Sequence, residues 1–170
     1  FLYNYDDEMS IKGNKIDELY ELDMKNNPED KHHTIHMLDA NDSFIALSII
    51  IALKLPKGTM VHIIGIGNQR VKECNRIEKW AQILNAFHVI AYELEDGIAI
   101  MSNPSILKME SKTIVVPTYE DHRLAMAFTI LGAAVSDKNK VIIKDGRTVE
   151  KTFPEFRQHI DSKYGIEYHG

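Results

Sequence analysis

The spacing of apolar and polar residues changes along the chain and divides it into helical and extended segments. Apolar residues three or four positions apart indicate helices, and short β-branched runs between turn-forming residues indicate buried strands. The predicted helices cover 43–53, 70–87, 122–135 and 154–164, and the predicted strands cover 59–66, 113–116 and 140–144, with two more strands within 92–101.

Turn and cap residues mark the ends of these segments. Asp42 or Ser43 caps the first helix and Asp121 caps the third, while Pro154 occupies a favoured first position of the last helix. The Asp96-Gly97 and Asp145-Gly146 dipeptides mark turns, and the first of them favours positive φ.

The first part of the chain is less regular. It shows two short extended runs, at 9–12 and 19–24, and then a polar stretch, 25–33, that predicts a surface loop with His32 and His33 in solvent.

The order strand, helix, strand, helix, strand occurs twice. An offset of 79 residues relates Asp42 to Asp121 and Lys72 to Lys151. Identity between the two copies is low, so the repeat rests on element order. The alternation predicts an α/β fold in which helices cover parallel strands.

Composition narrows the class of protein. Hydrophobic residues make up 44% and charged residues 26%, which excludes a disordered or low-complexity chain. A net charge of −5 argues against nucleic acid or an anionic membrane as partner, because both need a basic surface. Any anion site must therefore come from a local cluster of cations.

Three further features concern the environment of the chain. The single cysteine, Cys74, cannot form an intramolecular disulfide, which predicts a cytoplasmic protein. The longest apolar stretch, 44–53, is shorter than the ~20 residues that cross a bilayer. Because the chain opens at Phe1 rather than Met, we expect it to be a piece of a longer polypeptide.

The residues best suited to chemistry fall at helix starts, where free N–H groups and added cations favour anions. They are Asp42, the run from Asn68 to Arg76, Asp121, His122, Arg123 and Lys151.

Along a helix over 70–87, at ~100° per residue, Lys72 and Arg76 form one cationic edge and Glu73 lies at the margin of the apolar face. Glu73 is then a candidate general acid or base, or alternatively an ordinary surface partner of Arg76. Cys74 falls beside the apolar face, where packing is expected. We assign no metal site to the eight histidines.

Three segments resemble motifs of one enzyme family. They are NQRVKECNRI from Asn68, YEDHRLAMAF from Tyr119 and KTFP from Lys151. They are similar to motifs of 5-enolpyruvylshikimate-3-phosphate (EPSP) synthase, in the form found in the fungal pentafunctional AROM polypeptide. Asp42 falls where that family has an acidic residue.

The resemblance implies an inside-out α/β barrel of repeated units, here incomplete. The expected units are 17–101 and 113–170, with an N-terminal remnant at 1–16. The chain would be the C-terminal part of a synthase, and its partners would be the missing N-terminal half and other AROM domains. The isolated chain is then expected to be inactive.

The resemblance also implies a reaction, the transfer of the enolpyruvyl group of phosphoenolpyruvate to the 5-hydroxyl of shikimate 3-phosphate, without metal or cofactor. The implied roles are as follows: Asp42, Asn68 and Lys72 bind shikimate 3-phosphate, and Arg76, Arg123 and Lys151 bind phosphoenolpyruvate. Asp42 would take the hydroxyl proton, Glu73 would protonate the methylene carbon, and Lys72 and His122 would assist. A catalytic role for Cys74 is doubtful, because the reaction needs no thiol nucleophile.

Two alternatives stay open at this point. One is the related UDP-N-acetylglucosamine enolpyruvyl transferase, which lacks the second and third motifs. The other is a non-catalytic or degenerate fragment that keeps the motifs only as scaffold.

Overall fold

The computed structural model describes residues 31–108, 113–135, 140–164 and 167–169, and side-chain surroundings up to residue 160. The extended runs expected at 9–12 and 19–24 lie outside the described residues, as does most of the expected loop over 25–33. No helix within these described ranges has both the length and the apolar character needed to cross a membrane.

The first sheet has the strand order β1-β2-β4-β3. Strand β1 (His32–His36) runs parallel to β2 (Met60–Ile64), while β4 (Gly97–Met101) is antiparallel to both β2 and β3 (Ala91–Leu94). Strand β1 was not predicted, and its exposed and buried residues alternate. The placement of His32 and His33 in a loop is therefore wrong; His32 is exposed as expected, but His33 is buried.

Strands β3 and β4 form the predicted hairpin, with Leu94 paired to Gly97. The expected positive φ at Asp96-Gly97 is wrong, since neither residue has one. Glycine is needed at position 97 because β4 and β2 approach each other closely there. A Cβ at Gly97 would lie 2.0 Å from the carbonyl oxygen of Ile63 on β2.

The second sheet is parallel throughout, in the order β5-β6-β7. Its strands are β5 (Thr113–Pro117), β6 (Lys140–Lys144) and β7 (Glu167–His169). The helix α4 (His122–Val135) connects β5 to β6, and α5 (Phe156–Tyr164) connects β6 to β7. Parallel neighbours need such crossovers, which is the predicted βαβ arrangement.

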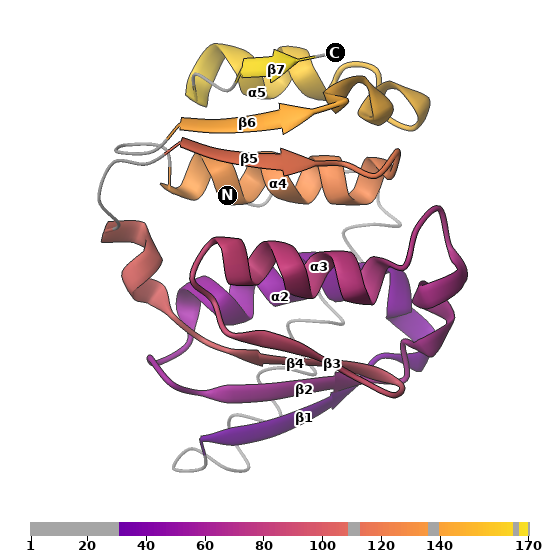
Figure 1. Cartoon of the computed structure of the whole chain (residues 1–170), viewed down its shortest axis with the longest axis vertical. Helices are drawn as coiled ribbons and strands as arrows, with labels where there is room; N and C mark the ends of the chain where they lie inside the picture. The colour runs from indigo at the N-terminus through magenta and orange to yellow at the C-terminus, as the bar shows by residue number, and fades with distance from the viewer. Residues whose placement is uncertain (1–30, 109–112, 136–139, 165–166, 170) are drawn as a thin grey trace.

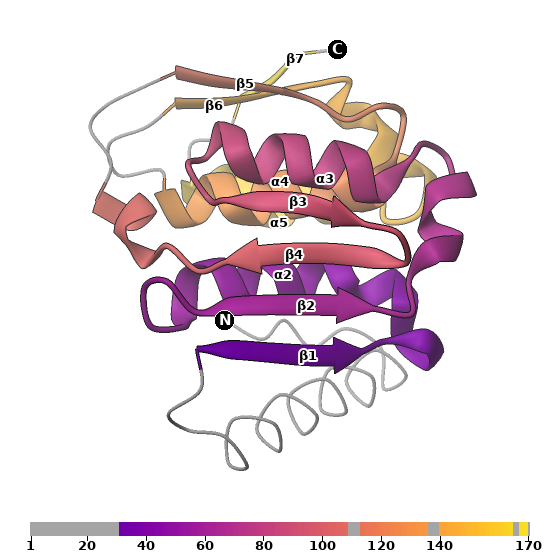
Figure 2. The same ribbon diagram turned by 60° about the horizontal axis from the view of Figure 1, so that its bottom comes forward.

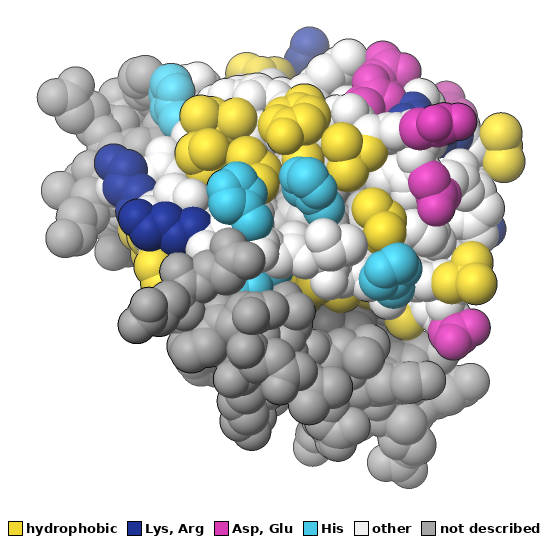
Figure 3. Space-filling view, turned by 90° about the horizontal axis from the view of Figure 1, so that it is seen from below, with side chains coloured by type: hydrophobic (Ala, Val, Ile, Leu, Met, Phe, Trp, Pro, Cys, Tyr) yellow, Lys and Arg dark blue, Asp and Glu magenta, His cyan; other side chains and the backbone are white. Residues whose placement is uncertain are grey.

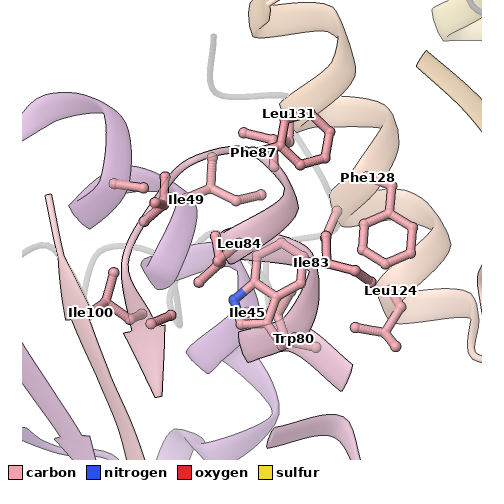
Figure 4. Packing of buried hydrophobic residues seen from close by; sticks show 14 of the residues in the cluster. Ile45, Ile49, Trp80, Ile83, Leu84, Phe87, Ile100, Leu124, Phe128 and Leu131 are labelled. Atoms are coloured by element: carbon pink, nitrogen blue, oxygen red, sulfur yellow. The ribbon is translucent and has the colours of Figure 1, made fainter. Parts of the chain in front are cut away.

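Helices α2 (Phe44–Lys54), α3 (Arg76–Ala86) and α4 lie between the two sheets (Figure 1). Turning the molecule brings the first sheet forward and leaves these helices behind it (Figure 2). Helix α2 is apolar nearly all round, as expected for a helix covered on several sides. In Figure 4, Trp80 and Ile83 of α3 meet Leu124 and Phe128 of α4, while Leu84 points the other way, toward Ile49 of α2 and Ile100 of β4.

The outer face of the first sheet points away from the helices. Seen from below, it carries histidine side chains among hydrophobic ones (Figure 3). On β1 the outward residues are His32, Thr34 and His36, which alternate with buried His33 and Ile35.

Helices inside and sheets outside confirm the predicted inside-out α/β class, and the described residues form no closed barrel. Both halves of the chain share the order strand, helix, strand, 3₁₀ helix and helix, and the first half has one more 3₁₀ helix, at Leu38–Ser43, before α2. The first half then ends in an antiparallel hairpin and the second in a parallel strand.

Two helix boundaries differ from the prediction. A helix does not cover 70–87: a 3₁₀ helix, η2 (Gly67–Val71), is followed by extended backbone at Lys72, and α3 begins at Arg76. Asn75 caps α3 by accepting a hydrogen bond from the Glu78 amide at 3.2 Å. Helix α5 begins at Phe156 rather than at Pro154.

Candidate active site

Arg76, the first residue of α3, lies at the centre of a polar cluster between the two halves of the chain, although its side chain is only 2% exposed. Its Nε donates to Asp121 Oδ2 at 2.6 Å, and Nη1 donates to Gln69 Oε1 at 2.9 Å. Nη2 donates to Glu73 Oε2 at 2.5 Å, and Asp42 Oδ1 lies 3.4 Å from Nη1. A buried guanidinium is stable only with such partners.

Asp121 joins α3 to α4. Its side chain is 0% exposed, and Oδ1 accepts the amides of Arg123 at 2.8 Å and Leu124 at 3.3 Å. These bonds confirm the predicted cap of α4, while the other oxygen takes the Arg76 bond. One carboxylate therefore fixes the N-termini of two helices against each other.

Asp42 does not cap α2. It lies in the 3₁₀ helix η1 (Leu38–Ser43), and Ser43 in the cap position makes no side-chain capping bond. Asp42 Oδ1 accepts from Gln69 Nε2 at 2.8 Å, and Oδ2 pairs with Arg123 Nη2 at 3.0 Å. The two residues come from opposite halves of the chain, so this ion pair spans 81 positions of sequence.

The charge state of Asp42 follows from these contacts. Burial raises its pKa, but the Gln69 hydrogen bond and the positive charges of Arg123, Arg76 and Lys72 outweigh burial. The pKa of Asp42 therefore lies below its usual 3.8, and the group is a carboxylate at neutral pH.

Gln69 is a residue that the sequence did not single out. It is fully buried, and its Nε2 donates to Asn41 Oδ1 at 2.7 Å, to Asp42 Oδ1 and, at 3.3 Å, to Asn68 Oδ1. The only signal was its place inside the matched motif, because a 3₁₀ turn leaves no α-helical periodicity that marks an inward side chain.

The β3–β4 hairpin holds the loop that carries Gln69. Asp96 accepts the amides of Gly65 at 3.0 Å and Gly67 at 2.7 Å through its two carboxylate oxygens. Arg70 Nη2 donates to the Leu94 carbonyl at 2.6 Å. A Cβ at Gly67 would lie 2.6 Å from Asp96 Oδ1, so this contact requires glycine.

Glu73 and Arg76 meet, but not as residues of one helix. Both Lys72 and Glu73 precede α3, so the angular argument that placed them on its surface is wrong. The reason is the Asn75 cap, which starts the helix four residues later than Lys72. Glu73 and Arg76 form an i,i+3 ion pair, but Arg76 is buried, so this contact is not the surface helix pair that the sequence offered as the alternative.

His122 and Cys74 lie beside this cluster. Burial and the nearby Arg123 and Arg76 lower the pKa of His122 more than Asp121 and Glu73 raise it. A neutral imidazole with Nδ1 3.8 Å from Glu73 Oε1 forms no ion pair. Burial and the Asp121 carboxylate raise the pKa of Cys74 to about 11, so its thiol stays protonated.

Unlike the paired residues of the cluster, the two lysines of the predicted site lie in solvent. Lys72 and Lys151 are exposed, and within the described part of the chain neither makes a side-chain hydrogen bond or an ion pair. Lys72 is close enough to lower the pKa of Asp42. The structure therefore brings together Asp42, Glu73, Arg76, His122 and Arg123, with Asn68 attached through Gln69.

The arrangement balances charge. The carboxylates of Asp42, Glu73 and Asp121 face the guanidinium groups of Arg76 and Arg123, with Lys72 near Asp42. The arginines are thus held in place, and an anion that bound them would have to replace carboxylate contacts. Among the described residues, no group of three or more His, Cys, Asp or Glu could hold a metal ion.

Comparison with known proteins places this chain in a family. The family model described as EPSP synthase (3-phosphoshikimate 1-carboxyvinyltransferase) matches residues 8–160. The pentafunctional AROM polypeptide of Yarrowia lipolytica is 37% identical over 144 residues, which are 84% of this chain and 9% of that protein. The AROM polypeptide of Schizosaccharomyces pombe is 38% identical over 141 residues, with 81% and 9% covered.

A solved structure agrees with these matches. An EPSP synthase from Acinetobacter baumannii superposes with a TM-score of 0.57 at 26% identity, over 79% of this chain and 30% of that one. The chain spans about a tenth of the AROM polypeptides that it matches. Because the family model covers most of the chain and the relatives exceed 30% identity, the chain belongs to the EPSP synthase family.

Proposed function

We propose that the chain forms one side of the active site of an enzyme that transfers the enolpyruvyl group of phosphoenolpyruvate to the 5-hydroxyl of shikimate 3-phosphate. The observation that carries the proposal is the Asp42–Arg123 ion pair at 3.0 Å. It joins Arg123 of the YEDHRLAMAF segment to Asp42, and Arg76 of the NQRVKECNRI segment contacts the same carboxylate. Two adjacent guanidinium groups suit a pair of anionic substrates.

The proposed chemistry is an addition followed by an elimination. The hydroxyl oxygen adds to C2 of phosphoenolpyruvate while C3 gains a proton, which gives a tetrahedral intermediate. Loss of phosphate from C2 and of a proton from C3 then restores the double bond. In this scheme Asp42 accepts the hydroxyl proton and Glu73 supplies the proton to C3.

The remaining roles concern binding. Asn68 and Lys72 hold shikimate 3-phosphate together with Asp42, while Arg76, Arg123 and Lys151 hold phosphoenolpyruvate. The exposed ammonium groups of Lys72 and Lys151 support these roles, because they leave donors available to anions. Neutral His122 assists as a hydrogen-bond partner in the same pocket, and Cys74 takes no part.

The rest of the site comes from elsewhere in a complete enzyme. The solved synthase chain is about three times as long as the segment matched here, since the match covers 30% of it. We propose repeat units at 17–101 and 113–170, an interdomain site completed by the other half of the synthase, and further AROM domains in the same polypeptide. We also place the enzyme in the cytoplasm, where a free thiol such as Cys74 persists.

Calorimetry of the chain tests the proposal. We expect weak binding of shikimate 3-phosphate and of phosphoenolpyruvate, tightened when the remaining half of the synthase is added as a separate chain. UDP-N-acetylglucosamine is the competing ligand and should not bind. Preferential binding of that nucleotide sugar would favour the related transferase, and no tightening on reconstitution would favour a non-catalytic fragment.

A further inference from the structure

Two loops lie side by side at the carboxyl ends of β5 and β6, where Pro117 pairs with Lys144. In the first loop the Asp121 amide donates to the Thr118 carbonyl at 3.0 Å, and in the second the Thr148 amide donates to the Asp145 carbonyl at 3.1 Å. Each loop is thus a closed turn. The first turn leads into α4, and the second opens the 3₁₀ helix η4 (Gly146–Lys151).

The two turns exchange side-chain hydrogen bonds. Thr148 Oγ1 donates to the Glu120 carbonyl at 3.0 Å, and Thr118 Oγ1 donates to the Asp145 carbonyl at 3.4 Å. Both threonines are buried. Because buried hydroxyls need partners, each one ties its own turn to the neighbouring turn.

The acceptors of these bonds belong to strained residues. Glu120 has φ 59° and Asp145 has φ 56°, and Tyr119 beside Glu120 has φ 55°. Left-handed backbone is unfavourable for residues other than glycine and persists only where its surroundings hold it. The two threonine hydroxyls bond the carbonyls of Glu120 and Asp145, and so they hold the turns in this conformation.

Each turn precedes residues that have a role in the proposed function. The first leads directly into Asp121, His122 and Arg123, and the second is followed by Lys151, three residues after Thr148. We propose that Thr118 and Thr148 are positioning residues that set the spacing between Arg123 and Lys151. This inference rests on the proposed function, in which these two cations bind phosphoenolpyruvate.

The main test replaces one hydroxyl by a methyl group. Thr148→Val in the full chain should weaken phosphoenolpyruvate binding by roughly 2- to 10-fold, the range expected from one neutral hydrogen bond. Binding of shikimate 3-phosphate should change less, because its proposed contacts lie in the first half of the chain. Thr148→Ser keeps the hydroxyl and should restore the affinity.

Thr129→Val is the matched control. Thr129 is also buried and its hydroxyl donates to the Ala125 carbonyl at 2.9 Å, but this bond stays within α4. We expect phosphoenolpyruvate affinity to be unchanged in this variant. An equal loss in both valine variants would assign the effect to general stability and overturn the positioning role.

Hydrogen exchange makes the test independent of ligand binding. The amides of Arg123 and Leu124 bond to Asp121, so a shifted turn should speed their exchange in Thr148→Val, while amides of β2 stay protected. If the wild-type chain binds no phosphoenolpyruvate, the proposed function fails and this readout still decides the positioning role.

A second variant, Thr118→Val, keeps the inference testable by hydrogen exchange if Thr148→Val folds poorly. Thr118→Val removes the longer of the two bonds and should give the same local effect in smaller measure. Unchanged exchange at Arg123 and Leu124 in both folded variants would overturn the inference. Uniformly faster exchange over the whole chain would overturn it too.

Discussion

Arg76 receives polar contacts from three separate segments of the chain. Asp42, Glu73 and Asp121 each place a carboxylate oxygen within 3.4 Å of its guanidinium, and Gln69 adds an amide oxygen. Asp121 and Arg76 are both buried, whereas Asp42 and Glu73 are partly exposed. The bond between Arg76 and Asp121 is therefore the one that depends most on both partners being present.

Arg76→Met should lower the free energy of unfolding by about 3–5 kcal/mol, because it leaves the buried Asp121 carboxylate without its cation. Chemical denaturation followed by the emission of Trp80, the single tryptophan, measures this change. Arg70→Met is the control. Arg70 is partly exposed, pairs with Glu93 and donates to the Leu94 carbonyl, so its loss should cost about 1–2 kcal/mol, less than the loss of Arg76. Similar losses in the two variants would contradict the buried network.

The lowered pKa of Asp42 predicts that the free energy of unfolding depends on pH. Its pKa is lower in the folded chain than the usual 3.8, so its contribution to stability is complete well above that value and is lost as the pH falls through the folded pKa. The unfolding free energy of the wild type should therefore drop more steeply below pH ~4 than that of Asp42→Asn. Parallel curves for the two proteins between pH 2 and 7 would contradict the assignment.

Cys74 should react slowly with alkylating reagents. Burial and Asp121 raise its pKa to about 11, and the thiolate is the reactive form. The alkylation rate of the folded chain should keep rising with pH up to that value, and Cys74→Ala should bind both substrates as the wild type does. A rate midpoint at or below pH 9.0, the usual thiol value, would contradict this account.

At the scale of elements, the site depends on short segments that join strands to helices. The 3₁₀ helices η1, η2 and η4 each follow a strand, and they carry Asp42, Gln69 and Lys151. The β3–β4 hairpin supports η2 through Asp96 and Arg70. These segments decide which side chains reach Arg76.

Asp96→Ala tests the support that the hairpin gives to η2. The change removes both acceptors of the Gly65 and Gly67 amides, so exchange of these two amides should accelerate and stability should fall by about 1 kcal/mol, in the range for exposed charged hydrogen bonds. Glu95→Ala alters the neighbouring exposed carboxylate in the same turn and should leave both quantities unchanged. Equal exchange rates in the two variants would contradict the role of Asp96.

Most helices and strands of the fold could be predicted from the sequence. Strands and helices from residue 42 onward follow from apolar spacing and β-branched runs, because those patterns report a buried face. Strand β1 was missed because His32 and His33 are polar, although one of them is buried. The start of α3 was misplaced because 3₁₀ turns and extended residues such as Lys72 have no helical periodicity.

The residues of the candidate site could also be predicted only in part. The helix starts indicated Asp42, Arg76 and Arg123 as a cationic and acidic cluster, and these residues meet. Gln69 and Asp96 could not be found by pattern, since their roles arise from contacts between segments distant in sequence.

At the scale of the whole molecule, the two sheets enclose helices α2, α3 and α4 (Figure 1). The polar cluster lies where the two halves meet. The Asp42–Arg123 and Arg76–Asp121 ion pairs both cross from one half to the other. The packing of Trp80 against Phe128, with ring centroids 5.8 Å apart, makes the same crossing in the apolar core. Any change in how the halves pack should therefore alter the site.

The most direct measurement of the central claim is enolpyruvyl transfer by the complete enzyme with Asp42→Asn, followed as phosphate release from phosphoenolpyruvate and shikimate 3-phosphate. Loss of a general base predicts a fall in kcat of roughly 100-fold or more. Asp39→Asn, an exposed change in the same 3₁₀ helix η1, should retain wild-type activity, and Lys72→Met should lose activity as Asp42→Asn does. Wild-type rates in Asp42→Asn would contradict the claim that this cluster carries the chemistry.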